Sequence, residues 1–97
     1  MIIVIVKGVA DIGKLLGGTG KHEIALTSGS DLNNLLDILV EKYGPALFER
    51  LYINNGRELR KDLRLLVNGQ DIVFLNGLNT ELKEGDRFSI IPPLMGG

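Results

Sequence analysis

The chain has 97 residues, of which 44% are hydrophobic and 24% are charged. These fractions lie near the globular averages of about 45–50% and about 25%, which excludes a disordered, collagen-like or low-complexity chain and predicts one domain with a single core. The net charge of −1 creates no strong positive field, so nucleic acid is not an expected partner. The chain has no cysteine, which excludes disulfides, thiolate zinc sites and cysteine nucleophiles.

The same composition predicts a cytoplasmic protein that does not associate with membranes. Small secreted domains usually need disulfides, and this chain cannot form them. The longest uninterrupted apolar run, residues 1–6, is far shorter than the roughly 20 residues that cross a bilayer. We identify neither a basic leader nor a signal-peptide cleavage site. His22 is the one histidine, so no pair of imidazoles can bind a metal, and we expect no metal site.

The first half of the chain predicts two strands and a helix. Residues 2–7 are rich in β-branched side chains and predict a strand that is apolar on both faces, with Ile3 and Ile5 on the second face. Residues 8–20 contain five glycines and predict a long turn, and residues 21–27 predict a second strand that pairs with the first. Leucines at helical spacing predict an amphipathic helix over residues 32–43, with Ser30 as its N-cap, Asp31 in its first turn and its end at Gly44.

The second half predicts a short helix, a charged loop and three strands. The helix covers residues 46–51, and the loop covers residues 57–64. Strands at 65–67 and 70–72 flank an Asn-Gly hairpin turn, and the last strand covers 87–91 with Phe88 and Ile90 facing the core. One long helix covers one face of one sheet, so we predict an α+β domain over residues 1–91 whose other sheet face is exposed.

Two polar clusters suggest chemistry that the sequence does not support. Residues 17–22 suggest a phosphate-binding loop, but that motif needs Gly at position 15 and Ser or Thr at position 22, where this chain has Leu15 and His22. No serine or carboxylate is spaced to form a catalytic set with His22, so we predict a solvated histidine at a strand edge. The charged loop contains four basic residues, namely Arg57, Arg60, Lys61 and Arg64. Such a mixed run of charges favours a solvated surface. The alternative is that these residues contact an acidic patch on a partner protein.

The C-terminal tail, residues 92–97, is the strongest functional signal. Pro92 and Pro93 favour a stiff extended backbone that can project up to about 20 Å over six residues. Gly96 and Gly97 follow, and a backbone without Cβ atoms can pass through a channel too narrow for any other residue. The free carboxylate of Gly97 is the one special functional group of this tail.

The order of these features resembles the β-grasp sulfur carriers and ubiquitin-like proteins, most of all the small subunit of molybdopterin synthase (the MoaD type). The matching motifs are the hairpin residues 67–69, the Glu-Gly-Asp turn at 84–86 and the Pro-Pro-Leu-Met-Gly-Gly ending at 92–97. The resemblance implies a β-grasp fold with four to five strands in a mixed sheet packed on one main helix. It covers nearly the whole chain.

The resemblance also implies a mechanism in which the chain has no catalysis of its own and binds no cofactor. A ubiquitin-activating-type enzyme would use ATP to adenylate the carboxylate of Gly97, and a sulfur donor would convert it to a thiocarboxylate. The large subunit of molybdopterin synthase would then receive the sulfur. Gly96 would provide clearance, and Pro92, Pro93, Leu94 and Met95 would fix the exit of the tail and contact the channel.

Ile3, Ile5 and Ile91 are expected on the outward face, where they would form an apolar docking patch. The alternative is that residues 10–20 cover these side chains. Three other functions use the same tail: a protein modifier joined to lysines of other proteins, a sulfur carrier for tRNA thiolation or thiazole synthesis, and an interaction module with an inert tail.

Overall fold

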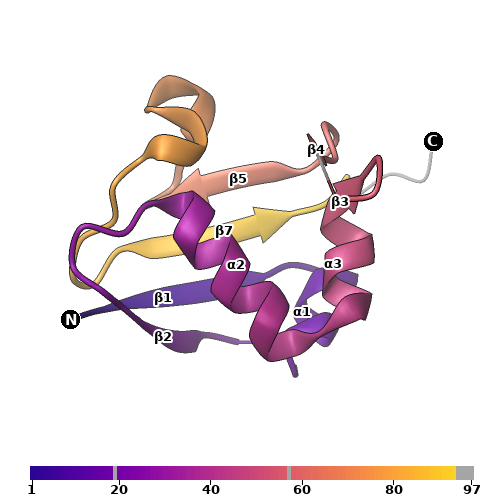
Figure 1. Ribbon diagram of the computed structural model, residues 1–97, viewed down its shortest axis with the longest axis horizontal. Coiled ribbons are helices and arrows are strands. Elements are labelled where there is room, and N and C mark those ends of the chain that lie inside the picture. Colours follow the sequence, from indigo (N-terminus) through magenta and orange to yellow (C-terminus); the bar gives the residue numbers. More distant parts are fainter. Residues whose placement is uncertain (19, 57, 94–97) are drawn as a thin grey trace.

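The computed structural model describes residues 1–18, 20–56 and 58–93. Its main feature is a mixed five-stranded sheet with the strand order β2-β1-β7-β5-β6 (Figure 1). The strands are β1 (Ile2–Gly8), β2 (His22–Leu26), β5 (Arg64–Val67), β6 (Gln70–Asp71) and β7 (Arg87–Ile91). β1 and β7 run parallel at the centre, and the other pairs are antiparallel. This confirms the α+β prediction and the mixed sheet.

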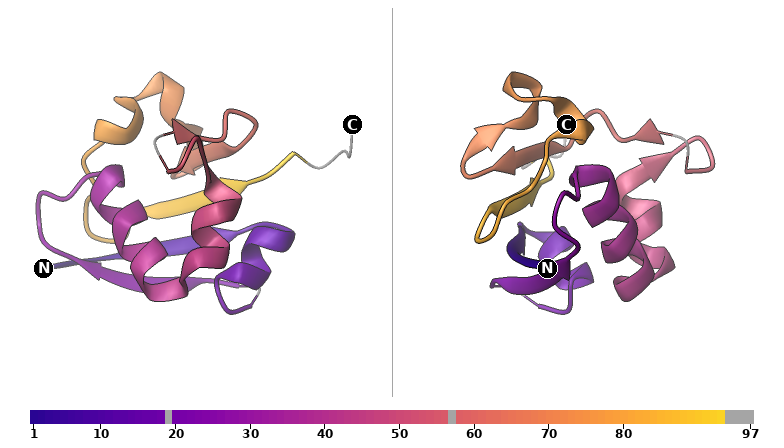
Figure 2. Two further views of the ribbon diagram at one scale, coloured as in Figure 1. Left: turned by 45° about the vertical axis from the view of Figure 1, so that its right-hand side comes forward. Right: turned by 60° about the vertical axis from the view of Figure 1, so that its left-hand side comes forward.

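The helices gather on one face of this sheet, as the right-hand view of Figure 2 shows for the two larger ones. They are α1 (Asp11–Leu15), α2 (Leu32–Tyr43) and α3 (Pro45–Leu51). A two-stranded hairpin follows α3, and two short 3₁₀ helices separate β6 from β7. These elements are β3 (Tyr52–Ile53), β4 (Glu58–Leu59), η1 (Ile72–Phe74) and η2 (Gly77–Asn79).

The core lies between the sheet and the helices. Alternate residues of each long strand point to this inner face and are buried: Val4, Val6, Ile24, Leu26, Leu65, Val67, Phe88 and Ile90. Four leucines of α2 pack against them, as the 3.6-residue spacing predicts: Leu32, Leu35, Leu36 and Leu39. No polar or charged side chain in the described part of the chain is buried. Apolar burial is therefore what holds α2 on the sheet.

The N-cap of α2 is Asp31, so the prediction of Ser30 is wrong by one residue. Asp31 has an extended backbone, and its carboxylate accepts a hydrogen bond from the N–H of Asn34 at 3.1 Å. The amide oxygen of Asn34 accepts the N–H of Asp31 in return at 2.8 Å, which completes a capping box. Ser30 instead uses its carbonyl oxygen to accept the N–H of Leu82 at 2.9 Å.

The glycine-rich segment 8–20 contains the helix α1, which the sequence prediction missed. Gly8 and Gly13 touch, since a Cβ atom added at Gly13 would lie 2.8 Å from the carbonyl oxygen of Gly8. This contact seats α1 at the end of β1, where Ile12 and Leu16 are buried in the core. The predicted loop 57–64 and the segment 72–79 likewise contain short elements, namely β4, the start of β5 and the two 3₁₀ helices.

Candidate functional site

β7 leads the chain to the tail, and it is an inner strand of the sheet, paired with β1 on one side and β5 on the other. The alternation of β7 continues past its last residue, because Pro92 is buried like Ile90 and Pro93 is exposed. Burial of Pro92 fixes the direction in which the chain leaves the sheet. The predicted tail residues Leu94, Met95, Gly96 and Gly97 lie outside the described residues.

Neighbouring elements hold the end of β7 from both sides. The N–H of Val9, just past the end of β1, donates to the carbonyl oxygen of Ile90 at 3.1 Å. On the other side Arg64 of β5 lies opposite Ile91. Pro92 has no N–H to satisfy, so the ladder can end there without a buried unpaired donor. The tail therefore starts from a rigid base.

The predicted docking residues share the outer face of the sheet, but they do not form one patch. Ile3 is 41% exposed, and Ile5 and Ile91 are half-buried. Ile5 lies beside Arg87 in the parallel register, and Ile91 lies four residues farther along β7, which is about 13 Å. Lys7 and Ser89 lie between them on the same face. The outer face therefore carries two separate apolar regions.

The helix α1 does not cover these residues. It packs against α3, and its buried side chains belong to the core on the inner face. The alternative in which residues 10–20 conceal the outer isoleucines is thus wrong for Asp11–Leu15. Ile3 remains accessible for contact with another molecule.

The apolar region nearest the tail contains residues that the sequence prediction missed. Leu66 of β5, Phe74 of η1 and Ile91 of β7 line a hollow of about 420 Å³, together with Arg64, Gly69, Gln70 and Asp71. We call this hollow the tail-side hollow. Phe74 is 76% exposed, and its neighbour Val73 is 72% exposed. The sequence signal was the run of four apolar residues 72–75, which cannot all be buried in a tight 3₁₀ turn.

Comparisons with known proteins show the family to which this chain belongs. The sequence matches the ThiS family over residues 10–97. The chain belongs to the ThiS family. It is 35% identical over 66 residues to a proposed sulfur carrier protein of Archaeoglobus fulgidus, covering 68% of this chain and 73% of the relative. It is 30% identical over 80 residues to the sulfur carrier protein CysO of Mycobacterium tuberculosis, covering 81% of this chain and 85% of CysO.

A solved structure of the same shape is the small archaeal modifier protein 1 of Methanosarcina acetivorans. The two share 30% sequence identity with a TM-score of 0.83, over 100% of this chain and 98% of the other. This ThiS-family chain is therefore a ubiquitin-like β-grasp protein of the sulfur-carrier type, as the motifs of the sequence predict.

The structure also describes the surroundings of His22 and of the segment that resembles a phosphate-binding loop. His22 is half-buried rather than solvated, because its Nε2 donates to the carbonyl oxygen of Gly18 at 3.1 Å and its ring meets Tyr43 edge-on at 6.2 Å. β2 begins at His22, so the loop after α1 leads into a strand and not into the helix that a phosphate loop requires. The residues described show no cluster of three or more potential metal ligands.

The basic loop is partly described. Arg57 lies outside the described residues, whereas Arg60 and Lys61 are exposed. Arg64 lies 3.7 Å from Asp71, where both flank the tail-side hollow. Across the described ranges, no helix has the length and apolar character needed to span a membrane.

Proposed function

We propose that this ThiS-family chain carries sulfur as a thiocarboxylate on Gly97. The observation that supports this is the rigid base of the tail, in which an inner strand ends at a buried Pro92 beside an exposed apolar hollow. A tail that leaves from a rigid base suits a group that must visit two active sites, because only the base needs to dock. In this proposal the reactive group is the carboxylate of Gly97, because residues 92–97 carry no ionisable side chain.

The proposed chemistry has two steps. An ATP-using partner of the ubiquitin-activating type transfers AMP to the carboxylate, with release of pyrophosphate. A sulfur nucleophile at the oxidation level of hydrosulfide then attacks the carbonyl carbon, the C–O bond to AMP breaks, and a C–S bond replaces it. AMP leaves far more readily than oxide, which is why activation precedes sulfur transfer.

The proposed acceptor is the large subunit of molybdopterin synthase, which would use the sulfur for the molybdenum cofactor. The motif at residues 84–86 and the Pro-Pro-Leu-Met-Gly-Gly ending support this assignment through their resemblance to the MoaD type. The partners would dock on the tail-side hollow, whose lining includes Ile91, the last residue of β7 before the tail. Docking would remove the exposed Phe74 side chain and the half-buried Ile91 side chain from water, which favours association.

A second candidate is a protein modifier joined through Gly97 to lysines of other proteins. The likeness to small archaeal modifier protein 1 supports it. Transfer of sulfur for tRNA thiolation uses the same activated tail and differs in the acceptor.

Mass spectrometry of the protein from its native cells tests these proposals. The chain has no cysteine, so a thiol-alkylating reagent that modifies the intact protein reports a thiocarboxylate. Alkylation is needed because oxidation of Met1 or Met95 adds almost the same mass as replacement of oxygen by sulfur. No Lys or Arg follows Arg87, so trypsin leaves Phe88–Gly97 on any lysine that the chain has modified.

The two outcomes separate the candidates. Alkylation located at Gly97 establishes the sulfur carrier, and a Phe88–Gly97 branch on other proteins establishes the modifier. A Gly97→Ala variant should lose both signals with unchanged thermal unfolding. Sulfur transfer at the normal rate by this variant would exclude the tail mechanism.

A further inference from the structure

A second hollow lies on the helix-covered side of the molecule, away from the outer sheet face. It has a volume of about 360 Å³, within the roughly 300–1,000 Å³ of ligand pockets. α2, α3, the β3–β4 hairpin and η2 all contribute to its lining: Asn33, Asp37, Val40, Phe48, Tyr52, Gly56, Leu59 and Leu78. We call it the aromatic groove. It shares no lining residue with the tail-side hollow.

Two stacked rings form one wall of the aromatic groove. Phe48 and Tyr52 have ring centroids 5.1 Å apart and planes 27° apart, and both are half-buried. Gly56 permits this stack, since a Cβ atom there would collide with the Phe48 ring, and its φ of +85° suits the hairpin turn. The hairpin is therefore closed over the rings, and it leaves part of each ring facing the hollow.

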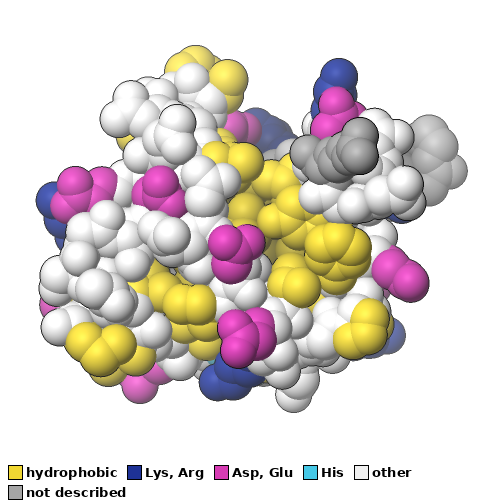
Figure 3. Space-filling view, viewed as in Figure 1, with side chains coloured by type: hydrophobic (Ala, Val, Ile, Leu, Met, Phe, Trp, Pro, Cys, Tyr) yellow, Lys and Arg dark blue, Asp and Glu magenta, His cyan; other side chains and the backbone are white. Residues whose placement is uncertain are grey.

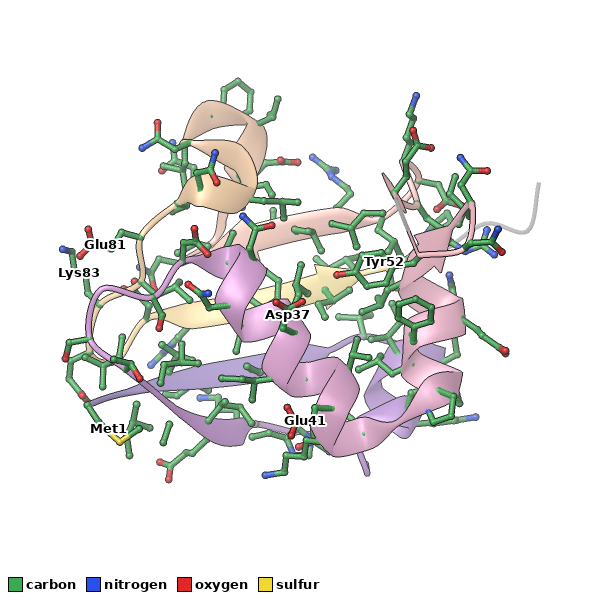
Figure 4. The ribbon with its side chains drawn as sticks, in the orientation of Figure 1. Met1, Asp37, Glu41, Tyr52, Glu81 and Lys83 are labelled. Atoms are coloured by element: carbon green, nitrogen blue, oxygen red, sulfur yellow. The ribbon has the colours of Figure 1, made fainter. Side chains whose placement is uncertain are left out.

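The lining of the aromatic groove also contains a carboxylate, Asp37. Asp37 projects from α2 toward Tyr52, and Glu41 lies one turn farther along the same exposed edge (Figure 4). The pKa of Tyr52 is raised, first by burial and then by the negative charge of Asp37, which shows that the two side chains share one electrostatic environment. Figure 3 shows apolar surface open to solvent between these acidic side chains and α3.

The one charged residue in the described lining of the aromatic groove is Asp37, and Arg60 lines an adjoining hollow that shares Phe48, Tyr52 and Gly56. The ion pairs within residues 1–18, 20–56 and 58–93 join Asp11 to Arg50, Asp71 to Arg64 and Glu81 to Lys83, and none includes Asp37. The described lining of the groove has no Lys or Arg. A carboxylate that shares a groove with two aromatic rings is an arrangement that attracts a cation.

We propose that the aromatic groove binds an arginine side chain presented by a peptide segment of a partner protein. The guanidinium would pair with Asp37 and lie over the face of Tyr52, because arginine combines ion pairing with stacking on aromatic rings. Aliphatic neighbours of that arginine would cover Val40, Leu59 and Leu78, which lie in the same lining. Aromatic side chains and arginine are also the residues that most often dominate protein interfaces.

This site gives the protein two independent contact faces. The tail-side hollow lies on the outer face of the sheet, and the aromatic groove lies among the helices that cover the inner face. A partner in the groove would leave the outer face and the tail available. The groove can therefore hold the chain next to one protein while the tail is used by another.

The test is a titration of the ¹⁵N-labelled full chain with an acetylated, amidated Leu-Arg-Leu tripeptide, followed by NMR. We expect saturable shifts centred on the amides of Asp37, Val40, Tyr52 and Gly56. The matched Leu-citrulline-Leu tripeptide keeps the shape of arginine and removes its charge. It should bind at least about tenfold more weakly, a difference of about 1.4 kcal/mol.

Four variants locate the interaction. Asp37→Asn should weaken binding of the arginine tripeptide about tenfold, and Asp62→Asn, which removes the same charge from an exposed loop, should leave it unchanged. Tyr52→Phe keeps the ring face and should keep the binding. A Gly97→Ala chain should bind like the wild type, which separates failure of this proposal from failure of the sulfur-carrier proposal.

Four results would overturn the proposal. Equal binding of the citrulline tripeptide would mean that the groove has no preference for a cation. Shifts centred outside the groove, or equal effects of Asp37→Asn and Asp62→Asn, would mean that the charge of the whole chain attracts the peptide. Absence of saturable shifts up to the solubility limit of the peptide would also exclude this site.

Discussion

The two faces of the central sheet differ in a way that separates stability from function. On the inner face, Val4, Val6, Phe88 and Ile90 are fully buried beneath α2 and α3. On the outer face, the residues next to them in sequence include Lys7, Arg87 and a 41% exposed Ile3. The same strands therefore contribute a continuous apolar layer to one side and a mixed surface to the other.

This difference follows from the two-residue period of a strand. A substitution at an inner position removes packing, whereas one at the next position changes only what the surface presents. The tail begins with one residue of each kind. Pro92 is buried and continues the inner positions of β7, whereas Pro93 is exposed and continues the outer positions. The predictions below test whether stability and partner binding divide between the two faces in this way.

The largest expected effect is on the inner face. Phe88→Ala removes a fully buried ring from an inner strand and should lower the free energy of unfolding by about 3–5 kcal/mol. Urea denaturation followed by circular dichroism measures this loss. The matched outer-face change, Ser89→Ala, should alter stability by less than about 0.5 kcal/mol. Similar losses for the two variants would contradict the separation of the faces.

The next effect concerns the seat of α1. Gly13→Ala places a Cβ atom 2.8 Å from the carbonyl oxygen of Gly8, so α1 must shift away from β1. We expect a loss of about 1–3 kcal/mol in the free energy of unfolding. Faster hydrogen exchange of the Val9 amide, which donates to Ile90 beside the tail, should accompany it. Gly18→Ala has open space around the added Cβ and serves as the comparison, although its φ of +137° adds backbone strain.

On the outer face, Phe74→Ala should change binding rather than stability. The ring is 76% exposed, so its removal should alter the free energy of unfolding by less than about 0.5 kcal/mol. If partners dock on the tail-side hollow, the KM for the adenylating enzyme should rise about tenfold or more, as for a residue that dominates an interface. ATP–pyrophosphate exchange measures this KM.

Ile3→Ala is the matched change in the other apolar region of the outer face. It should leave the KM nearly unchanged, because Ile3 lies at the far end of the sheet from the tail. A rise in KM for Ile3→Ala with no rise for Phe74→Ala would move the docking site to β1.

The parts of this molecule that the sequence predicted are those with a strong period. The alternation in β1 predicted which residues are buried, and the leucine spacing predicted α2 from Leu32 to Tyr43. The sequence also indicated the ThiS family, because the motifs near its end occur in a fixed order.

The missed parts depend on contacts between segments that are distant in sequence. Asp and Ser are both favourable N-cap residues. The hydrogen bond from the N–H of Leu82 to the carbonyl oxygen of Ser30 determines that Asp31 is the N-cap of α2. α1 has five residues, which is too short to show a helical period in the sequence. Its Gly13 resembled a turn residue, because the contact with Gly8 forms only in the folded chain. The tail-side hollow joins β5, β7 and η1, so the exposure of Phe74 followed from the fold and not from its neighbours.

The smallest expected effect comes from removing an ion pair that links α1 to α3 on the helix-covered side. The Nε of Arg50 donates to Asp11 at 2.6 Å, and this hydrogen bond lowers the pKa of Asp11 below its ordinary value of 3.8, although burial acts in the opposite direction. A lowered pKa in the folded state stabilises the protein above the unfolded pKa, and the stabilisation is lost as the pH falls through the folded pKa. Both side chains are partly exposed, at 53% for Asp11 and 26% for Arg50, so the pair should contribute about 0.2–1 kcal/mol.

Asp11→Asn tests this sign directly. The difference in unfolding free energy between wild type and variant should be largest at neutral pH and should shrink as the pH falls below about 4. It should also shrink in concentrated salt, because the exposed pair is screened. A difference that stays constant with pH would mean that Asp11 stabilises α1 through packing or its position in the first turn. Charge would then have no part in joining α1 to α3, and the helix-covered side would be held by apolar contacts alone.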